Sequence, residues 1–150
     1  MTSQPAPASH RPLDHTADAG VEIDAPSREA LFVEAAIALA DTLTPVERVG
    51  CTVERVLELE AANDELLLVD FLNEILFLFE TEGLVFAAAV VLLEGGDESS
   101  SPVRMRAVLR GEEYDESKHA LRTLIKAVTY HGLRVQRDGE RYTGRVLFDL

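Results

Sequence analysis

Apolar residues recur at helical spacing after Ser27, a residue type that often caps the start of a helix. The repeat stops at Thr44-Pro45, because proline disfavours a helical conformation in the residue before it. Its members are Leu31, Ala35, Leu39 and Leu43. A helix is therefore predicted from about residue 28 to residue 43, with one face in the core.

A second helix is predicted from Asn63 or Asp64 to about Glu82, and most of its residues between Leu66 and Phe79 are apolar. Its one narrow polar stripe, at positions i, i+3 and i+4, consists of Asp70, Asn73 and Glu74. The apolar run is short and is interrupted by this stripe, which argues against a membrane span. Such a helix is either central to the fold or half-covered by a partner.

Most of the remaining chain has the alternation or the apolar runs of strands. Strands are predicted at residues 20–25, 52–61, 84–94, 103–112, 129–137 and 141–150. The last two form a hairpin around Asp138-Gly139, a strong turn signal. A helical turn or short helix is expected at residues 115–118, extending to about residue 124. The predicted class is α+β, with two main helices packed on one face of a mixed or antiparallel sheet.

Length and composition indicate one folded domain at residues 13–150. Residues 1–12 are rich in proline, alanine, serine and glutamine without an apolar stretch, so we interpret them as a flexible N-terminal leader rather than a secretory signal. Cys51 is the single cysteine, which excludes an intrachain disulfide and fits a reducing compartment. We therefore expect a cytoplasmic protein.

The net charge of −13, from 14 basic and 27 acidic residues, disfavours direct binding to RNA or to an anionic membrane. Both depend on lysine and arginine that neutralise phosphates. The chain also lacks a P-loop, a Gly-x-Gly-x-x-Gly motif and a Gly-x-Ser-x-Gly motif. An RNA-related role would run through a protein partner.

Two acidic segments are candidates for chemistry. Asp14 to Asp18 precedes the first predicted strand, and Asp149 with the α-carboxylate of Leu150 ends the chain. Oxygen donors of this kind suit Ca²⁺, Mg²⁺ or Mn²⁺ rather than zinc. Spacing alone favours plainer interpretations, namely a local turn for the first segment and a surface strand end for the second.

A second polar cluster interrupts an apolar strand pattern and consists of Lys126, Thr129, Tyr130 and His131. Lys126 would hold a phosphate or pair with a nearby carboxylate. A strand lysine in an ordinary salt bridge is the slightly better interpretation from the pattern alone.

Several separated blocks resemble the archease family, in the order in which they occur in that family. They are Asp14-His15-Thr16-Ala17-Asp18-Ala19-Gly20, Leu72-Asn73-Glu74-Ile75-Leu76, Glu82-Gly83-Leu84-Val85-Phe86, Gly111-Glu112, Lys126-Ala127-Val128-Thr129-Tyr130-His131 and Phe148-Asp149-Leu150. The resemblance runs from about residue 13 to residue 150 and is looser at residues 95–102. Val128 and Leu150 stand where the family has isoleucine, and both keep the apolar character.

The resemblance implies that the protein is not an enzyme but an activator of an RtcB-type RNA ligase. That ligase joins RNA ends in tRNA splicing or RNA repair with GTP and a divalent metal, and archease promotes its guanylylation and multiple turnover. GTP would be held by the ligase, and RNA would be met only through it.

The resemblance also implies a metal site, with calcium expected first and magnesium or manganese as alternatives. The implied ligands are Asp18, Asp149 and the terminal carboxylate of Leu150. Further functional candidates are Asp14, His15, Lys126 and His131. Two other functions stay open: a metal-dependent phosphoesterase that uses the same carboxylates, and a general chaperone, suggested by the apolar helix.

Overall fold

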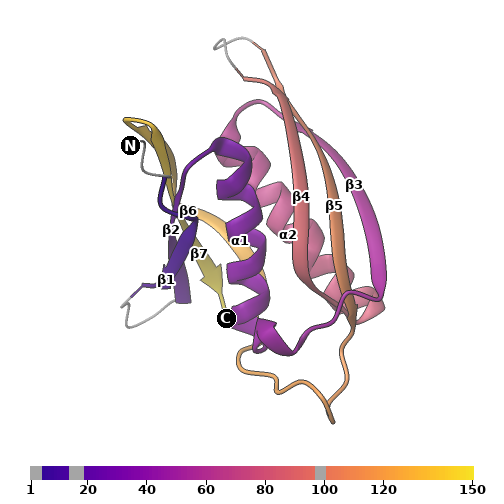
Figure 1. The fold of residues 1–150 in the computed structure, drawn as a ribbon. Coiled ribbons are helices and arrows are strands. Elements are labelled where there is room, and N and C mark those ends of the chain that lie inside the picture. Colours follow the sequence, from indigo (N-terminus) through magenta and orange to yellow (C-terminus); the bar gives the residue numbers. More distant parts are fainter. Residues whose placement is uncertain (1–4, 14–18, 97–100) are drawn as a thin grey trace.

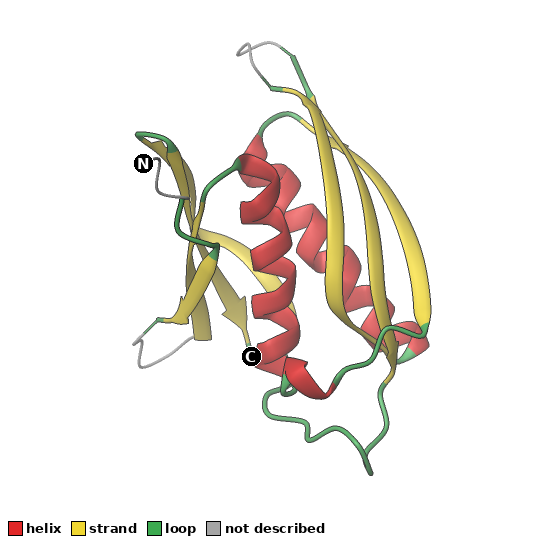
Figure 2. Cartoon of the chain, in the orientation of Figure 1, coloured by secondary structure: helices red, strands yellow, loops and turns green. Residues whose placement is uncertain are grey.

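Two antiparallel sheets enclose a layer of two helices (Figure 1). The computed structural model describes residues 5–13, 19–96 and 101–150. Figure 2 shows the same three layers, with the four-stranded sheet on one side of the helices and the three-stranded sheet on the other. The predicted α+β class is confirmed. The expectation of a single sheet covered on one face is wrong, because the helices are apolar on two sides and each side has its own sheet.

The four-stranded sheet has the order β1-β2-β7-β6. Its strands are β1 (Ser9–Pro12), β2 (Ala19–Ala25), β6 (Ala127–Asp138) and β7 (Arg141–Asp149). The predicted hairpin is present, with Asp138 opposite Arg141 across the turn. β7 lies in the middle of the sheet, so the last strand of the chain is paired on both edges.

The prediction that the leader extends to Pro12 is wrong for β1. Ser9 to Pro12 pair with β2, with Ser9 opposite Asp24 and Pro12 opposite Val21. The Ser-His-Arg-Pro sequence carries no strand signal because it is short, polar and proline-terminated. An edge strand tolerates these features, since one of its edges needs no hydrogen-bond partner.

The three-stranded sheet has the order β3-β5-β4. Its strands are β3 (Val53–Ala61), β4 (Leu84–Gly95) and β5 (Val103–Glu113). The predicted bounds of these strands are confirmed to within a residue or two. β3 alternates between half-buried and exposed side chains along its length, as its sequence pattern predicts.

Helix α1 (Arg28–Leu43) begins where the Ser27 hydroxyl accepts a hydrogen bond from the Ala30 amide at 3.1 Å. It is followed by the 3₁₀ turn η1 (Val46–Arg48). Helix α2 (Asp64–Glu82) ends at Gly83, whose φ of 67° is the left-handed conformation that glycine adopts without strain. Both predicted helices are therefore confirmed.

The core lies between the helices and on both of their flanks. Phe32 of α1 and Phe71 of α2 meet with ring centroids 6.2 Å apart, and both are fully buried. The apolar side of α2 faces this core. Of the two interpretations of this helix from its sequence, the first is therefore correct: the helix is central to the fold. No helix in the described ranges is long and apolar enough to cross a membrane.

Residues 114–126 connect the two sheets. They contain a turn at residues 116–118 but no helix, so the predicted extension to about residue 124 is wrong. The segment is held instead by contacts with other elements: the Arg122 amide donates to the Leu43 carbonyl at 2.7 Å, at the end of α1. These backbone groups satisfy each other across the molecule rather than within a helix.

Candidate functional site

Three neighbouring strands of the four-stranded sheet, β2, β7 and β6, each start or finish at the same end of the sheet. Ala19, the first residue of β2, is opposite Phe148, and Ala127, the first residue of β6, is opposite Asp149. In an antiparallel sheet, the starts of β2 and β6 lie beside the end of β7. Asp149 and Leu150 are both exposed at this end of the sheet. We call this end of the sheet the β7 end.

Lys126 lies next to Asp149 at the β7 end. Its amide donates a hydrogen bond to the Asp149 carbonyl at 2.8 Å, which fixes the two backbones side by side. Both side chains are exposed, and neither makes a hydrogen bond or an ion pair with another described residue. The predicted salt bridge of Lys126 is thus not formed within the described ranges, and a cation and an anion are both available at the β7 end.

Asn73 of α2 holds the start of β6 in place. Its Oδ1 accepts from the Val128 amide at 2.9 Å, and its Nδ2 donates to the Val128 carbonyl at 3.1 Å. β6 is an edge strand, and Val128 is paired with Phe148 on the other side. The Asn73 side chain therefore takes the place of a further strand and positions the residues just before Val128.

His131 belongs to an irregular part of β6. The pairing register with β7 shifts between Thr129 and Arg134, and Gly132 there has a φ of 68°. The His131 amide donates to the Thr129 hydroxyl at 3.2 Å, and its ring is exposed. The structure brings Lys126, Asp149 and Leu150 together, but no hydrogen bond links His131 to any of them.

The other predicted site residues, Asp14, His15 and Asp18, lie outside the described residues. On the chain they lie between Leu13 and Ala19, and Ala19 directly follows Asp18 and pairs at the β7 end. Within the described ranges, no group of three or more His, Cys, Asp or Glu side chains is placed to hold a metal. The ligand set therefore stays a prediction.

The half-buried Glu112 and the buried His119 form a polar pair that the sequence pattern did not indicate. His119 is 2% exposed, and its Nε2 is 2.7 Å from Glu112 Oε1. Its Nδ1 accepts from the Asp115 amide at 2.9 Å. An accepting Nδ1 carries no proton, so the neutral ring donates from Nε2. A lone histidine outside any periodic pattern gave no signal for this role.

The pKa of Glu112 is lowered to about 2. The main cause is a hydrogen bond from the Gly50 backbone, followed by hydrogen bonds from Lys118 and His119. These contacts tie the residue 114–126 segment to the end of β5 and to the loop before β3. The Glu112–His119 pair therefore anchors the start of the segment that leads to Lys126.

Residues 10–150 match the Archease protein family. A protein archease of Methanopyrus kandleri is 39% identical over 138 residues, which cover 92% of this chain and 96% of that protein. A protein archease of Pyrococcus furiosus is 36% identical over 83% of this chain and 85% of its own length.

Two solved structures share the fold. The solution structure of protein 1598 of Methanobacterium thermoautotrophicum has a TM-score of 0.74 at 26% identity, covering 94% of this chain and 98% of that one. The crystal structure of an archease of Thermotoga maritima, described as a possible chaperone, has a TM-score of 0.56 at 25% identity, covering 93% and 96%.

The sequence matches and the shared fold define a class of small α+β proteins. The relatives named above are called protein archease or, in one case, a possible chaperone, and neither name is that of an enzyme. The chain belongs to the archease family.

Proposed function

We propose that this protein activates an RtcB-type RNA ligase, and that the β7 end is the part that acts on the ligase. Family membership supports the general role. The specific observation that carries the proposal is the exposed Asp149 carboxylate, which no described cation neutralises, at the edge where β2, β6 and β7 meet. On this proposal the protein is a cofactor without turnover of its own, and the ligase holds the GTP and the RNA.

The donor chemistry of the β7 end fits a divalent metal. We propose that Asp18, Asp149 and the terminal carboxylate of Leu150 hold it, with calcium as the first candidate and magnesium or manganese as alternatives. Adjacent carboxylates repel one another unless a cation lies between them, and all of these donors are hard oxygens. When bound, such an ion would neutralise negative charge on a phosphate.

The chain's own residues would present this charge to the ligase. The backbone hydrogen bond from Lys126 holds Asp149 at its place beside β6, and Asn73 fixes β6 against α2. The Lys126 side chain is exposed and would contact a phosphate at the same edge. The overall negative charge would favour approach to a basic, RNA-binding partner.

The direct test is a multiple-turnover RNA ligation assay with purified RtcB-type ligase, GTP and this protein. Asp18→Ala should abolish stimulation of ligase guanylylation. Asp138→Ala is the matched control, because Asp138 is an exposed aspartate at the opposite end of the β6–β7 hairpin. Equal stimulation by the two variants would refute a role for the β7 end.

Metal binding is tested separately by calorimetry with Ca²⁺. A peptide tag after Leu150 removes the free α-carboxylate from that position and should weaken binding, whereas a tag before Met1 should not. Equal affinity of the two tagged forms would remove Leu150 from the ligand set. Phosphoester hydrolysis by the purified protein without ligase would instead favour the phosphoesterase alternative.

A general chaperone is the second candidate. The observation in its favour is exposed apolar surface on α2 and on the outer face of β4, where Phe77 is 55% exposed and Val90 62% exposed. The T. maritima relative is described as a possible chaperone. Suppression of aggregation of unrelated proteins, equal for wild type and Asp18→Ala and reduced by Phe77→Ser, would support this function over ligase activation.

A further inference from the structure

Helix α2 has an uncovered face, whereas no residue of α1 is exposed. The exposed residues in the body of α2 follow one another at intervals of four, four, three and three positions, which places them on one face of the helix. They are Leu66, Asp70, Glu74, Phe77 and Glu80, and we call them the α2 stripe. The Phe77 ring is 55% exposed, so this face presents an aromatic side chain among carboxylates.

The three carboxylates of the α2 stripe have no cation partner within the described ranges. Asp70 accepts one long hydrogen bond, at 3.5 Å, from the uncharged Tyr130 hydroxyl. Glu74 and Glu80 make no hydrogen bond or ion pair with another described residue. The exposed Lys126 forms no ion pair with any of the three, and one lysine can balance only one carboxylate. The stripe therefore has a net negative charge.

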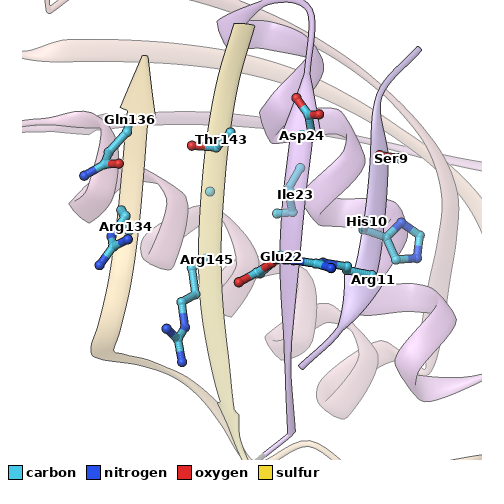
Figure 3. Close-up of a pocket in the computed structure, with 11 residues that line it drawn as sticks. Ser9, His10, Arg11, Glu22, Ile23, Asp24, Arg134, Gln136, Thr143 and Arg145 are labelled. Atoms are coloured by element: carbon cyan, nitrogen blue, oxygen red, sulfur yellow. Dashed lines mark hydrogen bonds and ion pairs between the residues drawn. The ribbon is translucent and has the colours of Figure 1, made fainter. Parts of the chain in front are cut away.

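The carboxylates of β2 and β3 are arranged differently. Glu22 of β2 accepts from Arg11 Nε of the neighbouring β1 at 2.9 Å (Figure 3). Asp24 of β2 accepts from Arg141 Nε at 2.8 Å. Each glutamate of β3 lies beside an arginine of β5, and the pairs are Glu54–Arg110 at 3.1 Å, Glu58–Arg106 at 2.9 Å and Glu60–Arg104 at 3.9 Å. The α2 stripe departs from this pattern of internal pairing.

The composition of the stripe is unfavourable for α2 itself. Asp70 and Glu74 are four positions apart, where like charges on a helix repel one another. Glu80 lies in the last turn, near the negative end of the helix dipole, and that turn contains no basic residue. Phe77 leaves more than half of its surface in water. A basic partner that covers this face would remove all three unfavourable features.

We propose that the α2 stripe docks on a basic protein surface, with Phe77 in an apolar pocket of the partner and the carboxylates beside its lysines and arginines. An aromatic anchor with charged residues around it is typical of the centre and rim of a protein interface. The acidic rim favours encounter with a positively charged partner and disfavours RNA or an anionic membrane as the occupant.

The proposal rests on the proposed function, because it assigns the stripe to the RNA-binding ligase as the basic partner. The stripe is continuous with the β7 end: Asn73, four positions before Phe77, holds Val128 at the start of β6, two positions after Lys126. The same partner can therefore contact the stripe and the β7 end. The stripe would supply affinity, and the β7 end would supply the effect on guanylylation.

The test is binding of this protein to purified RtcB-type ligase, followed by surface plasmon resonance at low and at high salt. Phe77→Ser should weaken binding about tenfold or more, mainly through faster dissociation, because it removes the anchor. Glu74→Lys should slow association, and the effect should shrink at high salt. Equal affinity of the wild type and Phe77→Ser for the ligase would overturn the proposal.

Two control variants match these changes outside the stripe. Val90→Ser removes an apolar side chain that is 62% exposed on β4. Asp138→Lys changes the net charge as Glu74→Lys does, but at the far end of the β6–β7 hairpin. Both controls should bind as the wild type does. Losses in the controls as large as those in the stripe variants would show general charge or surface effects and overturn the proposal.

The concentration dependence of ligase stimulation separates docking from activation. Phe77→Ser should need more protein for half-maximal stimulation yet reach the wild-type maximum, whereas Asp18→Ala should lower the maximum. If the wild type stimulates the ligase and Phe77→Ser does so at the same concentrations, docking through the stripe is wrong while the proposed function stands. If the wild type neither binds nor stimulates the ligase, the proposed function fails and the assignment of the stripe fails with it.

Two other occupants of the stripe have results of their own. A wild-type dimer in sedimentation equilibrium that dissociates in Phe77→Ser would assign the stripe to a second copy of this chain. Suppression of aggregation of unrelated proteins that falls in Phe77→Ser, with ligase affinity unchanged, would assign it to a general chaperone activity. Either result would overturn the proposal.

Discussion

Replacing Asn73 by alanine tests whether one side chain of α2 holds the edge strand that leads to the β7 end. The substitution removes two hydrogen bonds at once, to the Val128 amide at 2.9 Å and to the Val128 carbonyl at 3.1 Å. Val128 is 3% exposed, so its backbone groups have little access to water in the native state. The loss should therefore exceed that of a surface contact.

The expected size follows from the two contacts. A net hydrogen bond contributes about 0.5–1.5 kcal/mol, and a buried group left without a partner costs about 1–3 kcal/mol. Local opening of an edge strand lets water reach one of the two groups. We therefore expect Asn73→Ala to lower the free energy of unfolding by about 2–3 kcal/mol. For a chain of this length, about 1 kcal/mol corresponds to roughly 2–4 °C in Tm.

The assay is urea unfolding followed by circular dichroism, with the free energy obtained by linear extrapolation. Glu74→Ala is the control, because Glu74 is the exposed next residue of the same helix and should change stability by less than about 0.5 kcal/mol. Hydrogen exchange adds a local readout: the Val128 amide should lose protection in Asn73→Ala. A loss no larger than that of the control, with the Val128 amide still protected, would refute the role assigned to Asn73.

Two further predictions concern contacts that stabilise the fold. Glu112→Gln should lower the free energy of unfolding by about 1.5–3 kcal/mol near neutral pH, because hydrogen bonds to a charged group are lost. The pKa of Glu112 falls from 4.5 to about 2 on folding, so this stabilisation is present above pH 4.5 and is lost as the pH drops toward 2. Urea unfolding of the wild type and of Glu112→Gln across that pH range measures this, and a difference in unfolding free energy that does not change with pH would contradict it. Gly83→Ala should lower the free energy of unfolding by about 1–2 kcal/mol. The φ of 67° is strained for alanine, although nothing lies within 4 Å of an added Cβ. An unchanged urea midpoint would show that the end of α2 shifts without strain.

The elements that the sequence predicted best are those with long periodic patterns or strong end signals. α1 follows a four-residue repeat and begins at Ser27, and α2 ends at Gly83, as expected. The β6–β7 hairpin follows from Asp138-Gly139. In each case the signal is local, because the residues that decide the structure are neighbours on the chain.

The elements that were missed depend on distant contacts. β1 has no apolar alternation and exists because β2 offers it a free edge. The segment after β5 has helix-compatible residues, yet its backbone is fixed by the Glu112–His119 pair and by the end of α1. The division of the strands into two sheets is likewise a property of the whole chain, since both sides of the helices must be covered.

The β7 end shows both kinds of information. Asp149 and Lys126 are 23 positions apart in the sequence. From the pattern around each residue alone, a surface strand end was the better interpretation of Asp149, and an ordinary salt bridge was the better interpretation of Lys126. The register of β6 and β7 joins them through one backbone hydrogen bond, and the start of β2 lies on the other side of β7. An antiparallel arrangement of β2, β7 and β6 brings these chain segments to one edge whatever their side chains are. The side chains then decide what the edge can do, so substitutions at Asp149 or Lys126 should alter function with little effect on stability, whereas substitutions at Asn73 should alter both.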